Sequence, residues 1–155
     1  MNGRGLAAGI AATAPLLLGL WWCRRTRFGP ITRLVAFVEE RIAPLFAGCR
    51  PAELALVALA AGVGEELLFR GVLQPALAAH VPPGWAVLAV GLLFGAVHWL
   101  TPTYALLAGL VGTYLGALYA ASGNLLAPIV AHALYDFVAL VVLTRVKPRP
   151  LPFVL

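Results

Sequence analysis

The stretch "GEELLFRG" at residues 64–71 places two glutamates and an arginine inside one of the most apolar regions of the chain. It follows "ELALVALAAGVG" at residues 53–64 and precedes "VLQPALAAHV" at residues 72–81. Charged side chains are costly in such surroundings unless they are paired, and inside a membrane they usually mark a functional site. The first question is therefore whether this segment lies in a membrane.

The composition favours a membrane. The chain has 155 residues, of which 62% are hydrophobic and 11% are charged, whereas a soluble domain carries about 25% charged residues. The net charge of +5 comes from residues 24–50, after the first apolar run, and from residues 145–149, after the last. This is the loop pattern of a membrane protein, not a basic face for nucleic acid. The expected partner is a lipid bilayer, and no nucleic acid is expected.

Five apolar segments are long enough to be membrane spans: residues 5–23, 52–79, 84–100, 103–121 and 124–144. Residues 30–47 instead have apolar side chains on one helical face, as in an interfacial helix. The predicted fold is an all-α transmembrane bundle of about five spans plus one interfacial amphipathic helix. Residues 1–50 would form an N-terminal part, residues 51–145 a catalytic membrane core and residues 146–155 a tail. The basic segments predict an external N-terminus and a cytoplasmic C-terminus in a bacterial inner membrane.

The spacing of the charges in "EELLFR" suggests two different roles for the two glutamates. Glu66 and Arg70 are four residues apart, with the acid first, which is the favourable order for a helical ion pair. Glu65 lies about 100° around the helix and has no such partner. We therefore expect one carboxylate to be neutralised and the other to be available for chemistry.

Three further ionisable residues lie within later spans. His98 falls on the same helical face as Gly91 and Gly95, so it faces a packed neighbour instead of lipid. His132 and Asp136 are one turn apart. The helical rise places Glu65 and His98 about 21 Å, His132 about 12 Å and Asp136 about 18 Å from the outer turns. These residues can therefore meet in one layer, in the cytoplasmic half of the membrane.

These residue types suit the hydrolysis of a peptide bond without a covalent intermediate. A carboxylate beside a histidine can act as a general base on water, and a second histidine with a neighbouring donor can stabilise an oxyanion. No Ser or Cys in this layer is placed as a nucleophile, and no HExxH zinc motif is present. We expect no cofactor and no metal. A metal site built from the same acids and histidines is the weaker alternative.

Three motifs resemble those of a known family. "EELLFR" at 65–70, "FGAVH" at 94–98 and "HALYD" at 132–136 match the EExxxR, FxxxH and HxxxN/D motifs, in order, of the CAAX-protease and bacteriocin-processing (CPBP, or Abi) family. The members are glutamic intramembrane endopeptidases, and the resemblance covers about residues 51–145. It implies that Glu65 and His98 activate water and that His132 and Asp136 line the oxyanion site. The supporting residues would be Glu66, Arg70 and Phe94.

The expected function is cleavage of a membrane-associated protein or peptide, near a C-terminal processing or sorting signal. Short bacterial members of the family resemble the chain better than the larger eukaryotic Ras-converting enzyme does. Two alternatives remain open: a non-catalytic immunity or scaffold protein of the same fold, and a proton or ion carrier. Loss of Glu65 would leave the first unaffected, and the second would conduct ions without cleaving peptides. The sequence specifies neither the oligomeric state nor the cleaved bond.

Overall fold

The computed structural model describes residues 3–145, which are helical almost throughout and contain no strand. The element order is α1 (Gly3–Arg25), α2 (Gly29–Phe37), the π-helix η1 (Val38–Ile42), α3 (Ala43–Phe46), α4 (Pro51–Glu66), the π-helix η2 (Leu67–Leu73), α5 (Gln74–Ala78), α6 (Pro83–Val97), α7 (Pro102–Ser122) and α8 (Leu126–Arg145). The all-α fold class is as predicted. The predicted tail, residues 146–155, lies outside the described residues.

Within residues 3–145, three helices are long and apolar enough to cross a membrane: α1, α7 and α8. They correspond to the first, fourth and fifth predicted spans. The second predicted span is the continuous run α4–η2–α5, and the third is α6, which is apolar but has only 15 residues. Leu18, Trp85 and Trp99 are each about 65% exposed, as expected for side chains that face lipid. The chain is an integral membrane protein, while the total of five spans stays a prediction.

A proline lies two residues after the end of each π-helix. Pro44 follows η1 after Ala43, and Pro75 follows η2 after Gln74. A proline has no N–H to donate, and its ring crowds the carbonyl of the residue four positions earlier. Local widening of the helix to a π pattern is one way to relieve this conflict. The run from Pro51 to Ala78 therefore continues as a helix, but at Leu67–Leu73 its hydrogen-bond register differs from that of an α-helix.

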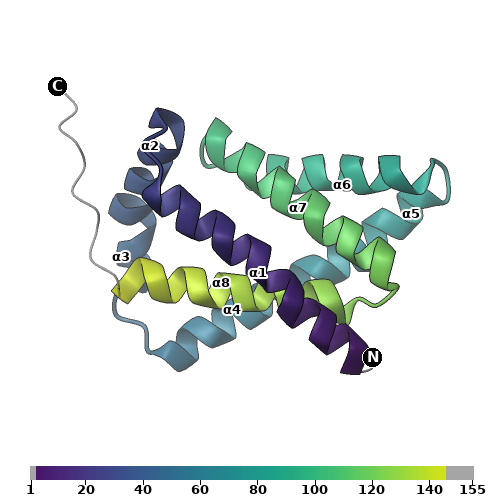
Figure 1. Cartoon of the computed structure of the whole chain (residues 1–155), viewed down its shortest axis with the longest axis horizontal. Coiled ribbons are helices and arrows are strands. Elements are labelled where there is room, and N and C mark those ends of the chain that lie inside the picture. Colours follow the sequence, from purple (N-terminus) through teal and green to yellow (C-terminus); the bar gives the residue numbers. More distant parts are fainter. Residues whose placement is uncertain (1–2, 146–155) are drawn as a thin grey trace.

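The helices form two closely packed groups. Helix α6 packs along α7, while α8 packs against both α1 and α4 (Figure 1). The segment α2–η1–α3, which corresponds to the predicted interfacial helix, lies beside the ends of α1 and α8 that carry Arg24, Arg25 and Arg145. Arg24 forms a 2.9 Å ion pair with Glu39 of η1. Arg145 donates to the carbonyl of Cys49 at 2.7 Å. Polar contacts thus attach the segment from α2 to Cys49 to both α1 and α8.

Small residues allow the closest approaches between helices. A Cβ built on Gly95 of α6 would collide with the carbonyl of Ala105 and would lie 2.9 Å from the Cα of Gly109 in α7. A Cβ on Gly62 of α4 would lie 2.9 Å from the backbone nitrogen of Ala133 in α8. Both contacts involve backbone atoms, which cannot move aside as a side chain can. A Cβ on Gly91 would lie 2.8 Å from the backbone nitrogen of Thr113, so both glycines on the helical face of His98 pack against α7.

We predict that Gly95→Ala destabilises the protein, whereas Gly84→Ala does not. Both positions lie in α6, but a Cβ at the exposed Gly84 would meet nothing within 4 Å. Overpacking of this kind costs about 1–3 kcal/mol, and replacing an unconstrained helical glycine by alanine is neutral or favourable. Thermal unfolding of both variants in the same detergent measures the difference. Equal midpoints for the two variants would contradict the close α6–α7 contact.

Candidate active site

A fully buried ionic cluster lies where α4 passes into η2. Glu66 and Arg70 both have side-chain exposures of 0%. Arg70 Nη1 donates to Glu66 Oε1 at 2.7 Å, so the predicted ion pair is present. Arg70 Nη2 donates to the carbonyl of Gly112 in α7. One turn further along, Gln74 Nε2 donates to the carbonyl of Gly116 at 3.1 Å. These two hydrogen bonds attach η2 and α5, both parts of the second predicted span, to the backbone of α7.

Glu66 also holds one of the two histidines, a contact that the sequence analysis missed. The Nδ1 atom of His132 lies 2.8 Å from Glu66 Oε1. An ionised carboxylate can only accept, so His132 donates from Nδ1 and turns its Nε2 toward the cavity. No spacing rule could have found this pair, because its members are 66 residues apart. Glu66 therefore orients the imidazole of His132 as well as pairing with Arg70.

The Nε2 atom of His132 faces two further carboxylates. Asp136 Oδ2 lies 3.4 Å away and Glu65 Oε2 lies 3.9 Å away. The first of these contacts follows from the one-turn spacing on α8. The second joins α8 to α4 and depends on their packing. The ring of His132 thus has Glu66 on its Nδ1 side and both Glu65 and Asp136 on its Nε2 side.

Glu65 and His98 form the second half of the site. His98 Nε2 lies 3.5 Å from Glu65 Oε2. His98 Nδ1 lies 2.7 Å from the carbonyl of Phe94, and a carbonyl can only accept, so Nδ1 carries a proton. The Nε2 atom is thereby turned toward Glu65. Among the described residues Oε2 of Glu65 and Oε2 of Glu66 both lack a hydrogen-bond partner. The two glutamates differ in side-chain exposure, 32% against 0%, and in the bonds that Glu66 Oε1 makes to Arg70 and His132.

Phe94 supports both histidines. Its ring is stacked on His98 with the centroids 4.3 Å apart, and it meets His132 edge-on at 5.9 Å. The guanidinium of Arg70 lies over the same ring, 4.9 Å from its centroid. Phe94 itself is 3% exposed. The contacts are those expected of a support residue that fixes the two imidazoles relative to the ion pair.

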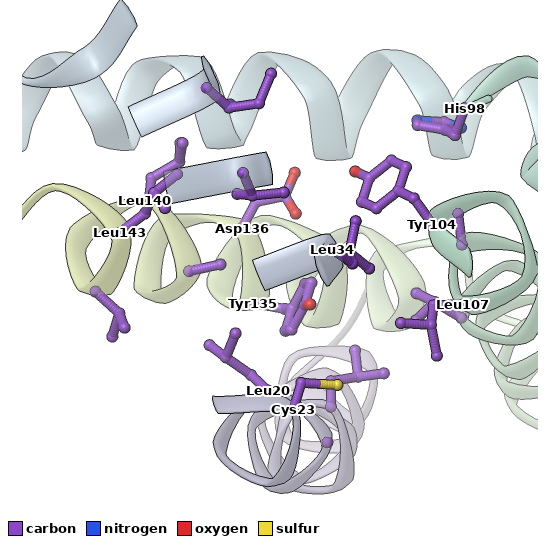
Figure 2. A pocket seen from close by; sticks show the side chains of 18 of the residues that line it. Leu20, Cys23, Leu34, His98, Tyr104, Leu107, Tyr135, Asp136, Leu140 and Leu143 are labelled. Atoms are coloured by element: carbon purple, nitrogen blue, oxygen red, sulfur yellow. The ribbon is translucent and has the colours of Figure 1, made fainter. Parts of the chain in front are cut away.

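A cavity of about 670 Å³ opens onto these groups. The side chains of Glu65, His98 and Asp136 are 32%, 26% and 30% exposed, in contrast to the closed Glu66–Arg70 pair. Figure 2 shows His98, Asp136, Tyr104 and Tyr135 around this space, together with leucines from several helices. The rest of the wall is mainly apolar and comes from α1, α2, η1, α7 and α8.

The structure thus brings together the four residues predicted to be catalytic, Glu65, His98, His132 and Asp136. Their catalytic roles stay predictions. The sequence analysis missed Tyr104 and Tyr135, because an aromatic residue in an apolar span resembles a packing residue. Within residues 3–145 no group of three or more His, Cys, Asp and Glu side chains has an arrangement suited to hold a metal ion.

We predict that Arg70→Ala lowers stability far more than Arg50→Ala. Loss of one partner from a buried ion pair costs about 3–5 kcal/mol because the other charge stays buried. The matched control, Arg50→Ala, removes an ion pair in which the side chains of Arg50 and Glu53 are 80% and 42% exposed. Exposed pairs of this kind contribute about 0–1 kcal/mol to stability. Membrane abundance and thermal unfolding of the two variants test this. Comparable losses in both variants would show that the Glu66–Arg70 pair is not a major structural element.

Comparison with protein-family models supplies independent support for the fold. Residues 49–138 match the model described as type II CAAX prenyl endopeptidase Rce1-like. Searches among curated proteins and among solved structures give no match. The matched residues are more than half of the chain, and they contain all three motifs and every member of the buried cluster. The chain therefore belongs to the Rce1-like family of type II CAAX prenyl endopeptidases, whose members are usually intramembrane proteases.

Proposed function

We propose that the chain is a glutamic-type intramembrane endopeptidase that hydrolyses a peptide bond of a membrane-associated protein or peptide. The observation that carries this proposal is the different surroundings of the two adjacent glutamates. Glu66 is buried and bonded to Arg70 and His132. Glu65 lines the cavity beside His98, and its side chain is 32% exposed. A carboxylate that can be reached from the cavity and is not bonded to a guanidinium is suited to take a proton from water.

In the proposed reaction Glu65 acts as the general base. It removes a proton from a water molecule, and the oxygen of that water attacks the carbonyl carbon of the scissile bond. The resulting tetrahedral intermediate carries a negative charge on the former carbonyl oxygen. When the C–N bond breaks, Glu65 returns the proton to the leaving amine. His98 Nε2, 3.5 Å from Glu65 Oε2, contacts the same water and holds it in place.

His132 supplies a hydrogen bond to the oxyanion in this mechanism. Its Nδ1 is engaged by Glu66, so Nε2 is the nitrogen available to the substrate. Asp136, 3.4 Å from Nε2, favours a proton on that nitrogen. An ionised Asp136 accepts hydrogen bonds but cannot donate one. We therefore assign Asp136 to the oxyanion site as the residue that pairs with the imidazolium form of His132, in which both ring nitrogens carry a proton.

The cavity indicates the chemical class of the substrate. Besides the four proposed catalytic residues, Arg24 and Glu39 line it, but most of its wall consists of apolar side chains such as Leu16, Leu20 and Leu34. A polypeptide segment in contact with this wall must itself be apolar or carry an apolar group. We place the cleaved bond near a C-terminal processing or sorting signal of a membrane-associated protein. No metal or cofactor takes part in the mechanism as proposed.

We further propose an external N-terminus and a cytoplasmic C-terminus in a bacterial inner membrane. Arg24 and Arg25 end α1 and Arg145 ends α8. These ends lie at the same end of the bundle as the α2–η1–α3 segment (Figure 1). Basic residues near membrane helices favour the cytoplasmic side.

Reporter fusions test this orientation. Alkaline phosphatase is active only outside the cytoplasm, so we expect no activity from a fusion after Leu155 and full activity from a fusion before residue 3. A cytoplasmically active fluorescent protein at the same two positions should give the reverse pattern. An active phosphatase at the C-terminus would reverse the proposed orientation.

We predict that Glu65→Gln lowers the cleavage rate by about 10²–10⁴-fold, the usual contribution of a general base, without lowering abundance. The assay uses purified protein in liposomes mixed with membrane proteins from cells that lack it. New peptide N-termini are labelled and quantified by mass spectrometry, so the substrate need not be known beforehand. Glu53→Gln, at the exposed start of the same helix, is the matched control and should cleave like the intact protein.

The same assay separates the competing functions. Cleavage products that are equally abundant with intact and Glu65→Gln protein would eliminate the glutamic mechanism. If the intact protein releases no new termini, while Glu65→Gln retains its cellular phenotype, the non-catalytic immunity or scaffold function is favoured instead. Treatment with a chelator followed by repurification should leave the rate unchanged. A rate that falls and returns on addition of zinc would replace the proposed mechanism by a metal-dependent one.

A further inference from the structure

The proposed oxyanion site has few hydrogen-bond donors. On the cavity side His132 offers a single N–H, at Nε2, because Nδ1 is engaged by Glu66. That N–H also faces the carboxylate of Asp136 at 3.4 Å. Glu65 and Asp136 are acceptors when ionised. Oxyanion sites for tetrahedral intermediates generally combine more than one donor directed at the developing charge. A second donor on the wall of the same cavity is therefore to be expected.

Tyr104 is placed to be that donor. It lies in the first turn of α7, where its backbone N–H donates to Thr101 Oγ1 at 3.1 Å, the N-cap contact that fixes the start of the helix. Its side chain lines the cavity that Glu65, His98, His132 and Asp136 also line. Figure 2 shows its ring between His98 and Asp136, with the hydroxyl directed toward the carboxylate side of the cavity.

The hydroxyl of Tyr104 is not used by the fold. Within residues 3–145 it makes no hydrogen bond, whereas the hydroxyl of Tyr114 on the same helix donates to the carbonyl of Ala12 at 2.8 Å. A phenylalanine at position 104 would provide the same ring for packing. Tyr135 lines the same cavity, but its ring packs against a cluster formed with α1 that contains Ala12, Leu16 and Ala131. The two tyrosines therefore differ in their relation to His98 and Asp136.

We propose that Tyr104 is a further catalytic residue, whose O–H donates a hydrogen bond to the oxyanion of the tetrahedral intermediate alongside His132 Nε2–H. The inference rests on the proposed endopeptidase function. Tyrosine remains protonated at neutral pH and is a donor even beside acidic groups. No proton is transferred from it: the hydrogen bond strengthens as the carbonyl oxygen becomes negative and weakens again when the C–N bond breaks.

The test compares Tyr104→Phe with the matched control Tyr119→Phe, a tyrosine of the same helix that does not line the cavity. The substrate is a synthetic peptide that spans a bond cleaved by the intact protein in the liposome assay described above. Loss of one oxyanion donor should lower kcat by about 10²-fold. KM should change by less than about threefold, since the interaction forms mainly in the transition state. Tyr119→Phe should stay within about twofold of the intact protein, and both variants should have unchanged thermal stability.

A second pair of variants distinguishes donation to the substrate from an indirect effect on Asp136. Tyr104→Phe is introduced into the Asp136→Asn background, and its effect on kcat is compared with its effect in the intact protein. A direct donor should cost about the same factor in both backgrounds. If the cost disappears with Asn at position 136, Tyr104 acts through Asp136 as a positioning residue, and the proposal is overturned.

A fluorinated tyrosine at position 104 provides a further measurement that preserves the ring. Its phenol ionises at a lower pH than that of tyrosine, so the rate should fall at a lower pH than in the intact protein. An unchanged pH profile, or a kcat of Tyr104→Phe within twofold of the intact value, would overturn the proposal. If Glu65→Gln is inactive at the same time, the endopeptidase function stands and the assignment of Tyr104 alone fails. A peptide that Glu65→Gln cleaves normally would instead remove the proposed function itself.

Discussion

The rest of the site depends on the buried carboxylate of Glu66. A charge in an apolar interior is strongly destabilising unless it is paired. Here one oxygen, Oε1, accepts from Arg70 on η2 and from His132 on α8. Arg70 in turn reaches the backbone of α7 at Gly112. A single carboxylate thereby links three parts of the bundle, and any shift between them would leave a charge without its partner.

This requirement also separates the chemistry of two neighbouring glutamates. Adjacent residues on a helix point about 100° apart, so only one of them can enter the ionic cluster. The other, Glu65, is turned to the cavity, where His98 and His132 approach it from different helices. The carboxylate of Glu65 can thus remain available for chemistry although its neighbour, Glu66, is held in the buried ion pair. Phe94 packs between the ion pair and the cavity-facing histidines, because its ring contacts the imidazoles of His98 and His132 and the guanidinium of Arg70.

Close helix packing makes such a compact site possible in a short chain. Glycines at the α6–α7 and α4–α8 contacts bring backbones together where a methyl group would collide. The carbonyls of Gly112 and Gly116 become accessible to Arg70 and Gln74 for the same reason. The N-terminal helices then complete the cavity with apolar side chains. Residues far from the three motifs therefore contribute to the surface that a substrate would meet.

The sequence by itself determined the all-α membrane fold, the positions of the helices and the pairs that lie within one helix. Glu66 with Arg70 and His132 with Asp136 could be predicted because helical periodicity alone places residues four apart on one face. Contacts between helices were decided by the tertiary structure. The bond from Glu66 to His132, the approach of Glu65 to His98, and the position of Tyr104 depend on how α4, η2, α6, α7 and α8 are rotated and packed. The local period carries no information on these rotations, since they follow from side-chain packing between segments distant in sequence.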